Sequence, residues 1–318
     1  MRVRELGEDA LIAAFAEIYQ AQPGVEIGIG DDGAVVVCDH PRQVISTDIA
    51  TEGIHFNRSW SSPFDIGAKI AIANLADIYG MGATPQYLTV ALSVSGEEEV
   101  SYLLDIARGI ESIAQAHSVS VVGGDVIAGS SLTIAITALG GVESPVLRSG
   151  ACVGDTVYLS QGTGRSLAGL LLLSKGLAGR DSDDVKFFQR PDFHPGDLPL
   201  FGFENISALM DVSDGLISDL SRIARASGVG IDLDIQEDQL AYLRELAERV
   251  EVPEWELFLR SGEEHSFIVV IPEEHLSKVP TQWIKIGKVV AGDQITSRGG
   301  ALDIEEKSWH WQLHNLGK

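Results

Sequence analysis

Residues 44–82 read VISTDIATEGIHFNRSWSSPFDIGAKIAIANLADIYGMG, and the rest of the chain is organised around them. The second half of this stretch predicts an amphipathic helix, because Ser62 is a typical N-cap and Pro63 suits the first helical position. Asp65 follows the cap by three residues, as in a capping box, and Gly80 ends the pattern. The first half predicts an apolar strand that opens into a loop at residues 46–48, Ser-Thr-Asp.

Polar groups in this stretch suggest a metal site. Three consecutive oxygen-bearing side chains at a strand end suit a hard cation. On the predicted helix, Asn74 and Asp77 share one face with Ile70, and burying two polar groups there is costly unless something uses them. The alternative is structural: Asp48 caps a turn, and Asn74 and Asp77 satisfy buried backbone groups. This stretch alone leaves both interpretations open.

Composition indicates a globular protein large enough for two domains. The chain has 318 residues, of which 45% are hydrophobic and 22% charged. No apolar run reaches the roughly 20 residues that a membrane helix needs. The first 20 residues predict an amphipathic helix rather than a signal peptide, so we expect a cytoplasmic protein without a membrane partner. Two cysteines, Cys38 and Cys152, are too few for a disulfide framework or a cysteine-rich zinc site.

The charge balance excludes one class of partner. Lys and Arg total 23 against 46 Asp and Glu, a formal net charge of −23. A nucleic-acid-binding protein needs a basic surface, so nucleic acid is not expected. Anionic substrates would need cations to mediate their approach to so negative a surface.

Carboxylates beside glycines recur along the chain. A turn at residues 28–33, GIGDDG, holds two adjacent aspartates. Residues 123–125, Gly-Gly-Asp, follow a buried strand predicted over 119–122, and Asp211 ends a short strand before Ser213 and Asp214 at the start of a helix that Gly228 terminates. The turn at residues 162–166 fits neither the dinucleotide nor the P-loop spacing, so we interpret it as a packing turn.

Together these carboxylates predict a magnesium site. They lie at predicted element ends in both halves: Asp31, Asp32, Asp48, Asp77, Asp125, Asp211 and Asp214. Carboxylates without Cys or His ligand spacing favour Mg²⁺, which in turn indicates phosphate. Without a P-loop or a protein-kinase signature, ATP would be held through metal ions.

Short motifs spread along nearly the whole chain, from Glu5-Leu6-Gly7 to the tail, resemble one family. They are GIGDD (28–32), STD with GxHF (46–48 and 53–56), NLADIYGMGA (74–83), GGD (123–125), RSGA (148–151), DVSDGL (211–216) and GEEH (262–265). Each motif alone is weak, but the set in this order is specific. It resembles the thiamine-monophosphate kinases, which have the aminoimidazole-ribonucleotide-synthetase-like fold.

The resemblance implies an α+β protein of two α/β domains. Residues 1–148 would bind ATP and Mg²⁺ and pair their sheet with a second copy in a homodimer, and residues 149–318 would complete the active site. It implies ATP-dependent phosphorylation of thiamine monophosphate to thiamine diphosphate by direct in-line transfer. No protein nucleophile or general base is expected, because the acceptor phosphate, with a second pKa of about 6, is largely ionised at neutral pH.

The resemblance also implies roles for individual residues. Several Mg²⁺ ions would be held by Asp32, Ser46, Thr47, Asp48, Asp77, Asp125, Asp211 and Asp214. ATP would contact Gly124, Asp125, Arg148 and Ser213. Thiamine monophosphate would contact His55, Glu263 and Trp311, although His55 alone can also be explained as a loop histidine with satisfied hydrogen bonds.

Alternatives within the fold are aminoimidazole-ribonucleotide synthetase, selenophosphate synthetase and the hydrogenase-maturation dehydratase. The second resembles chains with a reactive Cys or selenocysteine near the N-terminus and the third resembles chains ending in Cys, and this chain has neither. A non-catalytic nucleotide-binding relative is the alternative from another class. It is suggested by residues 261–264, Ser-Gly-Glu-Glu, where the family usually has two glycines followed by Glu-Asp.

Overall fold

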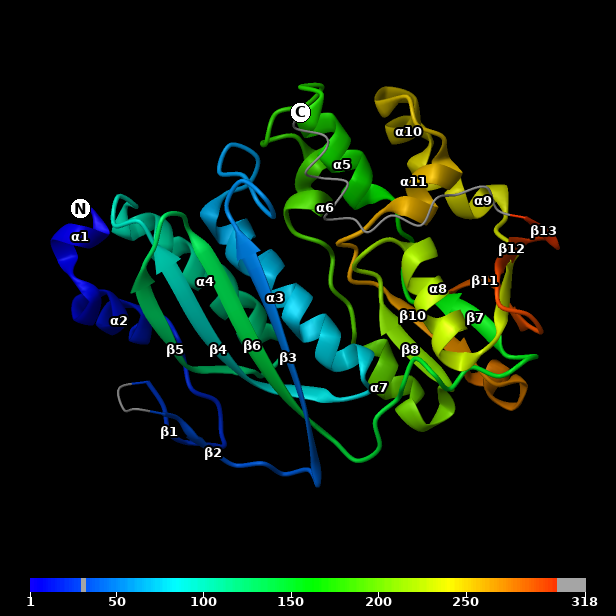
Figure 1. The fold of residues 1–318 in the computed structure, drawn as a ribbon, viewed down its shortest axis with the longest axis horizontal. Coiled ribbons are helices and arrows are strands. Elements are labelled where there is room, and N and C mark those ends of the chain that lie inside the picture. Colours follow the sequence, from blue (N-terminus) through cyan, green and yellow to red (C-terminus); the bar gives the residue numbers. More distant parts are fainter. Residues whose placement is uncertain (30–32, 302–318) are drawn as a thin grey trace. The chain divides into compact units, whose positions relative to one another are not determined.

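A computed structural model of the chain describes residues 1–29 and 33–301. They divide into two compact units, one of residues 1–78 and 83–143, the other of residues 79–82 and the chain from Ser144 onward. Both units combine helices with a β-sheet (Figure 1), which confirms the predicted α+β class. Within the described ranges, no helix is long and apolar enough to cross a membrane.

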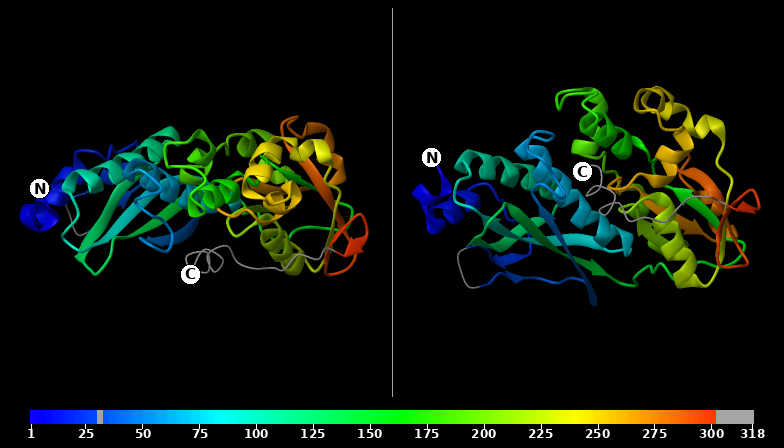
Figure 2. Two further views of the ribbon diagram at one scale, coloured as in Figure 1. Left: turned by 90° about the horizontal axis from the view of Figure 1, so that it is seen from above. Right: turned by 45° about the horizontal axis from the view of Figure 1, so that its top comes forward.

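The first unit is built on a sheet of strand order β3-β6-β4-β5. The strands β4 and β5 are parallel, while β6 is antiparallel to both of its neighbours. The bounds of these strands are β3 Arg42–Thr51, β4 Thr84–Val94, β5 Ser120–Ala128 and β6 Thr133–Val142, and a small ribbon of β1 Val25–Ile27 and β2 Val35–Val36 lies beside them. Two long helices, α3 Pro63–Gly80 and α4 Val100–Ala116, cover one face of the sheet and leave the other face open (Figures 1 and 2).

Two glycines allow α3 and α4 to touch through their backbones. A Cβ atom on Gly67 would lie 2.0 Å from the carbonyl oxygen of Ile106, and one on Gly109 would lie 2.0 Å from that of Phe64. Only glycine permits so close an approach. The fully buried side chains of Ile66, Leu75 and Ile110 fill the layer between these helices and the sheet.

The predicted helix of residues 63–80 is confirmed, including its start. Ser62 Oγ accepts a hydrogen bond from the Asp65 backbone N–H at 3.1 Å and donates one to Asp65 Oδ2 at 2.6 Å. The N-terminal helix is instead split into α1 Val3–Leu6 and α2 Glu8–Ala16. Gly7, with φ of 84°, separates the two because this left-handed conformation cannot continue a helix.

Two predicted strand ends are wrong. Residues 46–48 lie in the middle of β3, paired with residues 136–138 of β6, and residues 123–125 lie in the middle of β5. Polar residues and glycines interrupt the apolar pattern of each strand, but backbone pairing with the neighbouring strand continues through them. In a strand successive side chains alternate between faces, so Thr47 lies on the open face of the sheet, opposite to Ser46 and Asp48.

The second unit is built on a sheet of strand order β13-β12-β9-β11-β7-β10-β8. All five residues of β10 are buried, as the uninterrupted apolar run Phe267–Ile271 predicts. The strands are β7 Thr156–Leu159, β8 Ala208–Asp211, β9 Gly230–Leu233, β10 Phe267–Ile271, β11 Ile284–Val290, β12 Ile295–Ser297 and β13 Gly300–Ala301. The helices are α5 Arg165–Ser174, α6 Lys186–Gln189, α7 Asp197–Phe201, α8 Leu216–Ser227, α9 Glu237–Leu240, α10 Arg244–Val250 and α11 Glu254–Arg260.

Candidate functional site

In the first unit, Ser46 and Asp77 meet between β3 and α3. Ser46 Oγ donates a hydrogen bond to Asp77 Oδ2, and both residues are half-buried. Asp48 lies two residues along β3 on the same side of the sheet and is also half-buried. The structure therefore brings three of the predicted metal-binding residues to the side of the sheet that α3 covers.

Asn74 serves the backbone. It is fully buried, its Nδ2 donates to the Ile70 carbonyl oxygen at 2.9 Å, and its Oδ1 accepts from the Asp48 backbone N–H at 3.3 Å. The structural interpretation of this residue is correct. Its effect is to hold the backbone of β3 at Asp48 against α3.

Thr47 does not join this group. Its hydroxyl lies on the open face of the sheet, 2.9 Å from the hydroxyl of Thr137 on β6. A second threonine pair, Thr51 with Thr133, lies on the same two strands at 3.1 Å. These hydroxyl pairs link β3 to β6 across the open face.

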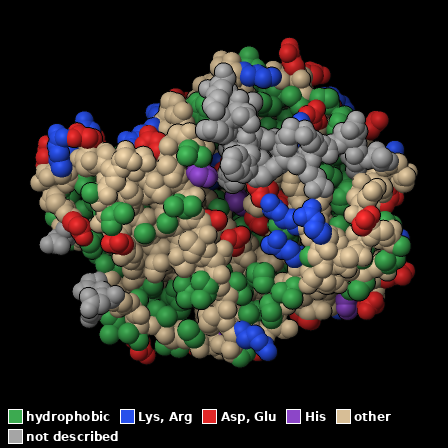
Figure 3. All heavy atoms as spheres, in the orientation of Figure 1, with side chains coloured by type: hydrophobic (Ala, Val, Ile, Leu, Met, Phe, Trp, Pro, Cys, Tyr) green, Lys and Arg blue, Asp and Glu red, His purple; other side chains and the backbone are tan. Residues whose placement is uncertain are grey.

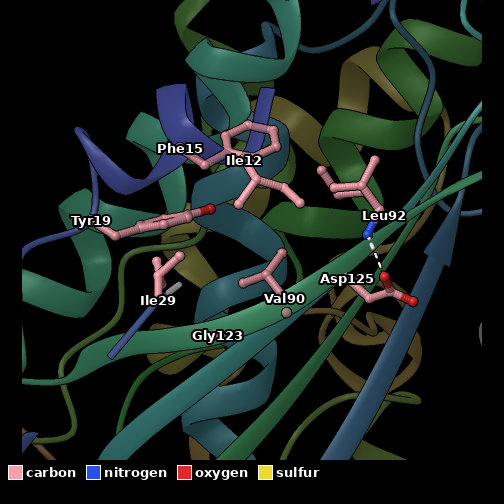
Figure 4. Close-up of a pocket in the computed structure, with 10 residues that line it drawn as sticks. Ile12, Phe15, Tyr19, Ile29, Val90, Leu92, Gly123 and Asp125 are labelled. Carbon is pink, nitrogen blue, oxygen red and sulfur yellow. Dashed lines mark hydrogen bonds between the residues drawn. The ribbon is translucent and has the colours of Figure 1, made fainter. Parts of the chain in front are cut away.

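Asp125 lies on the exposed edge strand β5 beside a small apolar cavity. Its Oδ1 accepts a hydrogen bond from the Val126 backbone N–H at 2.9 Å (Figure 4). Gly124 precedes it, and a Cβ atom there would lie 1.8 Å from the Val90 carbonyl oxygen, so only glycine fits. The cavity, about 60 Å³, is lined by Ile12, Phe15, Tyr19, Ile29, Val90, Leu92, Gly123, Gly124, Asp125 and Val126.

His55 follows β3 and is held by the backbone. Its Nδ1 is 3.1 Å from the Thr51 backbone N–H, which donates to it. Nδ1 is thus an acceptor, so the neutral ring carries its proton on Nε2. The hydrogen bond fixes the orientation of a half-buried ring.

In the second unit, three predicted residues lie in the loop that follows β8. Asp211 ends β8 and is buried, while Ser213 and Asp214 are half-buried. Asp214 Oδ2 forms an ion pair with Arg222 of α8. Neither Ser213 nor Asp214 is the N-cap of the helix, because α8 begins at Leu216 with Gly215 at the N-cap.

Asp219, which was not among the residues predicted from the sequence, organises this loop. It is fully buried, and its Oδ2 accepts hydrogen bonds from the backbone N–H groups of Ser213 at 3.0 Å and Asp214 at 3.1 Å. Its Oδ1 pairs with Arg222 at 2.6 Å. Burial, followed by the negative charge of Asp211, raises the pKa of Asp219 to about 8, which Arg222 opposes. An Asp beside the apolar stripe of Leu216 and Leu220 was the available signal.

Residues 261–265 form a second loop that packs on the first. The Glu263 backbone N–H donates to the Ser213 carbonyl oxygen at 2.8 Å. Glu264 is fully buried and accepts from the backbone N–H groups of Gly164 at 2.7 Å and Ser166 at 3.0 Å. The N-terminus of α5 is therefore filled by a carboxylate of the chain itself, which agrees with interpreting residues 162–166 as a packing turn.

The remaining predicted residues are not part of these groups. Arg148 is exposed, and its carbonyl oxygen accepts from Ser227 Oγ at 2.9 Å. Asp32 and Trp311 lie outside the described residues. Within residues 1–29 and 33–301, no three His, Cys, Asp or Glu side chains converge as a preformed metal site.

Family comparisons cover most of the chain. Residues 30–142 match the family "AIR synthase related protein, N-terminal domain", and residues 153–300 match the corresponding C-terminal domain. The thiamine-monophosphate kinase of Mycobacterium tuberculosis is 32% identical over 301 residues, which cover 91% of this chain and 87% of that protein. That of Corynebacterium glutamicum is 36% identical over 282 residues, covering 84% and 82%.

Solved structures agree with these matches. A structure described as AaThiL complexed with AMPPCP and TMP superimposes with a TM-score of 0.76 at 27% identity, and the alignment covers 97% of this chain and 98% of that one. Similarity in sequence and in fold thus extends over both units. The chain belongs to the thiamine-monophosphate kinase family and is built from its two AIR synthase related domains.

Proposed function

We propose that the protein transfers the γ-phosphoryl group of ATP to thiamine monophosphate, which yields thiamine diphosphate and ADP. The observation that carries this proposal is the 32–36% identity to thiamine-monophosphate kinases over most of the chain. The similar structure described as complexed with AMPPCP and TMP supports the same pair of substrates. In direct in-line transfer, an oxygen of the acceptor phosphate bonds to the γ-phosphorus as the bond from the β,γ-bridging oxygen to that phosphorus breaks.

No side chain needs to remove a proton in this reaction. The second pKa of a phosphate monoester is about 6, so the acceptor oxygen is already largely ionised at neutral pH. The chain instead has to bring anions together and orient them. Its carboxylates cannot do so directly, because they carry the same charge as the phosphates.

The donor groups fit Mg²⁺. Ser46, Asp48 and Asp77 supply oxygen atoms in the first unit, and Asp211 and Asp214 do so in the second. The guanidinium of Arg222 pairs with both Asp214 and Asp219, and the buried Asp211 interacts with His265 instead, so the carboxyl groups of this loop outnumber its one guanidinium. Mg²⁺ is usually held by one or two carboxylates plus phosphates and water, so a preformed cage of protein ligands is not required.

We assign the metal ions to these five residues and to Thr47, Asp125 and Asp32, as the family resemblance implies. When bound, Mg²⁺ neutralises the charge of the phosphates. Gly124, Arg148 and Ser213 are proposed to contact ATP. His55, Glu263 and Trp311 are proposed to contact thiamine monophosphate, with the His55 ring held in place by Thr51.

We also propose that the open face of the first unit's sheet pairs with a second copy of the chain. Ile45 and Ile49 on the edge strand β3 are 65% and 59% exposed, and Ile127 on the opposite edge strand β5 is 55% exposed, so large apolar side chains are exposed along both edges of this face. In the space-filling view, hydrophobic side chains are scattered among uncharged side chains, backbone and a few acidic side chains over the part of the molecule where this face is in front (Figure 3). Burying these isoleucines against a copy would remove them from water.

A non-catalytic relative is less well supported. Its basis was the altered segment at residues 261–264, but there Ser261 Oγ donates to Glu264 Oε1 and Glu264 anchors α5. The two changed residues therefore complement each other, as expected of a substitution that preserves the loop.

The test is to incubate the purified protein with Mg-ATP and thiamine monophosphate, and in parallel with free thiamine, and to quantify the products chromatographically. Thiamine diphosphate and ADP in equal amounts, from thiamine monophosphate alone, is the expected result. ADP without thiamine diphosphate would assign a different acceptor, and no ADP would favour the non-catalytic alternative.

A further inference from the structure

The loop of residues 261–265 holds a conformation that its sequence alone does not favour. Glu263 has a φ of 53° and His265 a φ of 51°, both in the left-handed region that residues other than glycine seldom occupy. Such conformations are unfavourable for residues other than glycine and persist when the surrounding contacts determine them. Contacts with neighbouring residues must therefore hold the loop in this conformation.

Backbone bonds fasten this loop to the residues that follow β8. The Val212 carbonyl oxygen accepts from the N–H groups of Glu264 at 3.2 Å and His265 at 2.9 Å, and the Val212 N–H donates to the Ser266 carbonyl oxygen at 2.7 Å. The Glu264 carboxylate fixes the other side of the loop to the start of α5. The backbone of His265 is thus held on both sides.

These backbone contacts fix the position of the His265 ring. Its Nδ1 is 3.1 Å from Asp211 Oδ2, and both residues are only 5% exposed. Since the partner is a carboxylate oxygen, Nδ1 carries the hydrogen and donates it. One of the two Asp211 oxygens is thereby occupied, which fixes the rotation of the carboxylate.

We propose that His265 is a positioning residue that orients the Asp211 carboxylate to receive a divalent cation. The proposal rests on the proposed function, in which Asp211 is a metal ligand. Hydrogen-bond partners of metal ligands typically contribute 10–100-fold to metal affinity. His265 is expected to contribute in that range, without touching metal or substrate.

The left-handed backbone of His265 limits which residues can replace it. Asn tolerates φ near 51° and places its Nδ2 the same number of bonds from Cα as Nδ1 of histidine, so His265→Asn should keep the donor. His265→Leu has nearly the shape of the Asn variant but no donor. Ser266→Ala is the matched control, because Ser266 is the adjacent buried residue and its hydroxyl has no hydrogen-bond partner among the described residues.

The probe is Mn²⁺, titrated into the full-length protein with a non-hydrolysable ATP analogue present and followed by the electron paramagnetic resonance signal of the free ion. Thermal unfolding in EDTA confirms that each variant is folded at the temperature of the titration. The expected result is Mn²⁺ affinity lowered about 10–100-fold in His265→Leu and close to wild type in His265→Asn and Ser266→Ala. Asp211→Asn should weaken binding at least as much as His265→Leu.

Two outcomes overturn the proposal in different ways. If Asp211→Asn weakens Mn²⁺ binding but a folded His265→Leu binds as wild type does, the positioning role is wrong and the assignment of Asp211 stands. If Asp211→Asn also binds Mn²⁺ normally, both the role of Asp211 as a ligand and the inference that depends on it are wrong.

Discussion

Asp77 and Asn74 lie on the same face of α3, and their side chains have different roles. Asn74 bonds to the backbone of Ile70 and Asp48, whereas Asp77 accepts from the side chain of Ser46. Helical spacing predicts that both face the sheet, but it cannot tell which of the two serves the backbone. That depends on where β3 passes, a long-range contact absent from the local pattern. Asp219 was missed for a different reason, because its backbone partners Ser213 and Asp214 are close in sequence but lie in a loop that a helical pattern does not describe.

Replacing Asp77 by Asn tests the metal assignment. The variant keeps the size of the side chain and loses its charge, so turnover is expected to fall by about 100-fold or more, as for other groups that stabilise developing charge electrostatically. Circular dichroism and thermal unfolding should be close to wild type. Asp105→Asn, which removes an exposed ion pair with Arg108 on α4, is the control and should keep full activity. A normal rate in Asp77→Asn would remove this residue from the site.

The buried carboxyl group of Glu264 should make the stability of the protein depend on pH. Burial raises its pKa to about 7, against an ordinary value of 4.5, despite the hydrogen bonds that it accepts. The folded protein then binds a proton that the unfolded chain has released, so stability falls as pH rises from about 4.5 to about 7. Glu264→Gln removes this contribution. The difference in unfolding free energy, variant minus wild type, should therefore increase by roughly 3 kcal/mol as pH rises from about 4.5 to about 7. Urea denaturation at several pH values measures this difference. A difference that stays constant with pH would contradict the assignment.

Among the elements, α3 was predicted with its bounds, and β3 and β5 were not. The start of α3 is determined locally by Ser62, Pro63 and Asp65, so the sequence contains all the information needed. The strands continue through residues 46–48 and 123–125 because β6 and β4 pair with them. In the sequence, a polar stretch of a strand whose sheet has one uncovered face looks like a loop, because the partner strand cannot be seen. This error does not affect the predicted fold class. It does change the directions in which successive side chains of β3 point, and therefore the face of the sheet on which Thr47 lies.

The cap of α3 should be measurable separately from the site. Ser62→Ala removes the hydroxyl that accepts from Asp65 N–H and is expected to destabilise the protein by about 1 kcal/mol in chemical denaturation. Turnover should be unaffected, because Asp77 lies several turns away on the helix. Ser59→Ala, which removes an exposed hydroxyl bonded to Asn57, is the control. Equal stability of the two variants would show that the cap contributes nothing.

For the whole molecule, two units of α+β structure were predicted from the order of motifs rather than from periodicity. The proposed dimer depends on a surface of the folded protein. The isoleucines of β3 can be recognised as part of an exposed surface only once it is known which face of the sheet each of them lies on. Ile49→Asp is expected to convert a wild-type dimer into monomers in sedimentation equilibrium, because a charge would be buried at the proposed interface. Leu200→Asp, at an 85% exposed position on α7, should leave the dimer intact. A dimeric Ile49→Asp variant would place the interface elsewhere.

Direct phosphoryl transfer from ATP to thiamine monophosphate can be followed in a single-turnover experiment with γ-³³P-labelled ATP. Excess enzyme is mixed with labelled ATP, Mg²⁺ and thiamine monophosphate, then quenched at successive times and separated into nucleotide, thiamine and protein fractions. Label should leave ATP and enter thiamine diphosphate at the same rate, with none on the protein. Label that passes through the protein before reaching thiamine diphosphate, or that never reaches it, would rule out direct transfer.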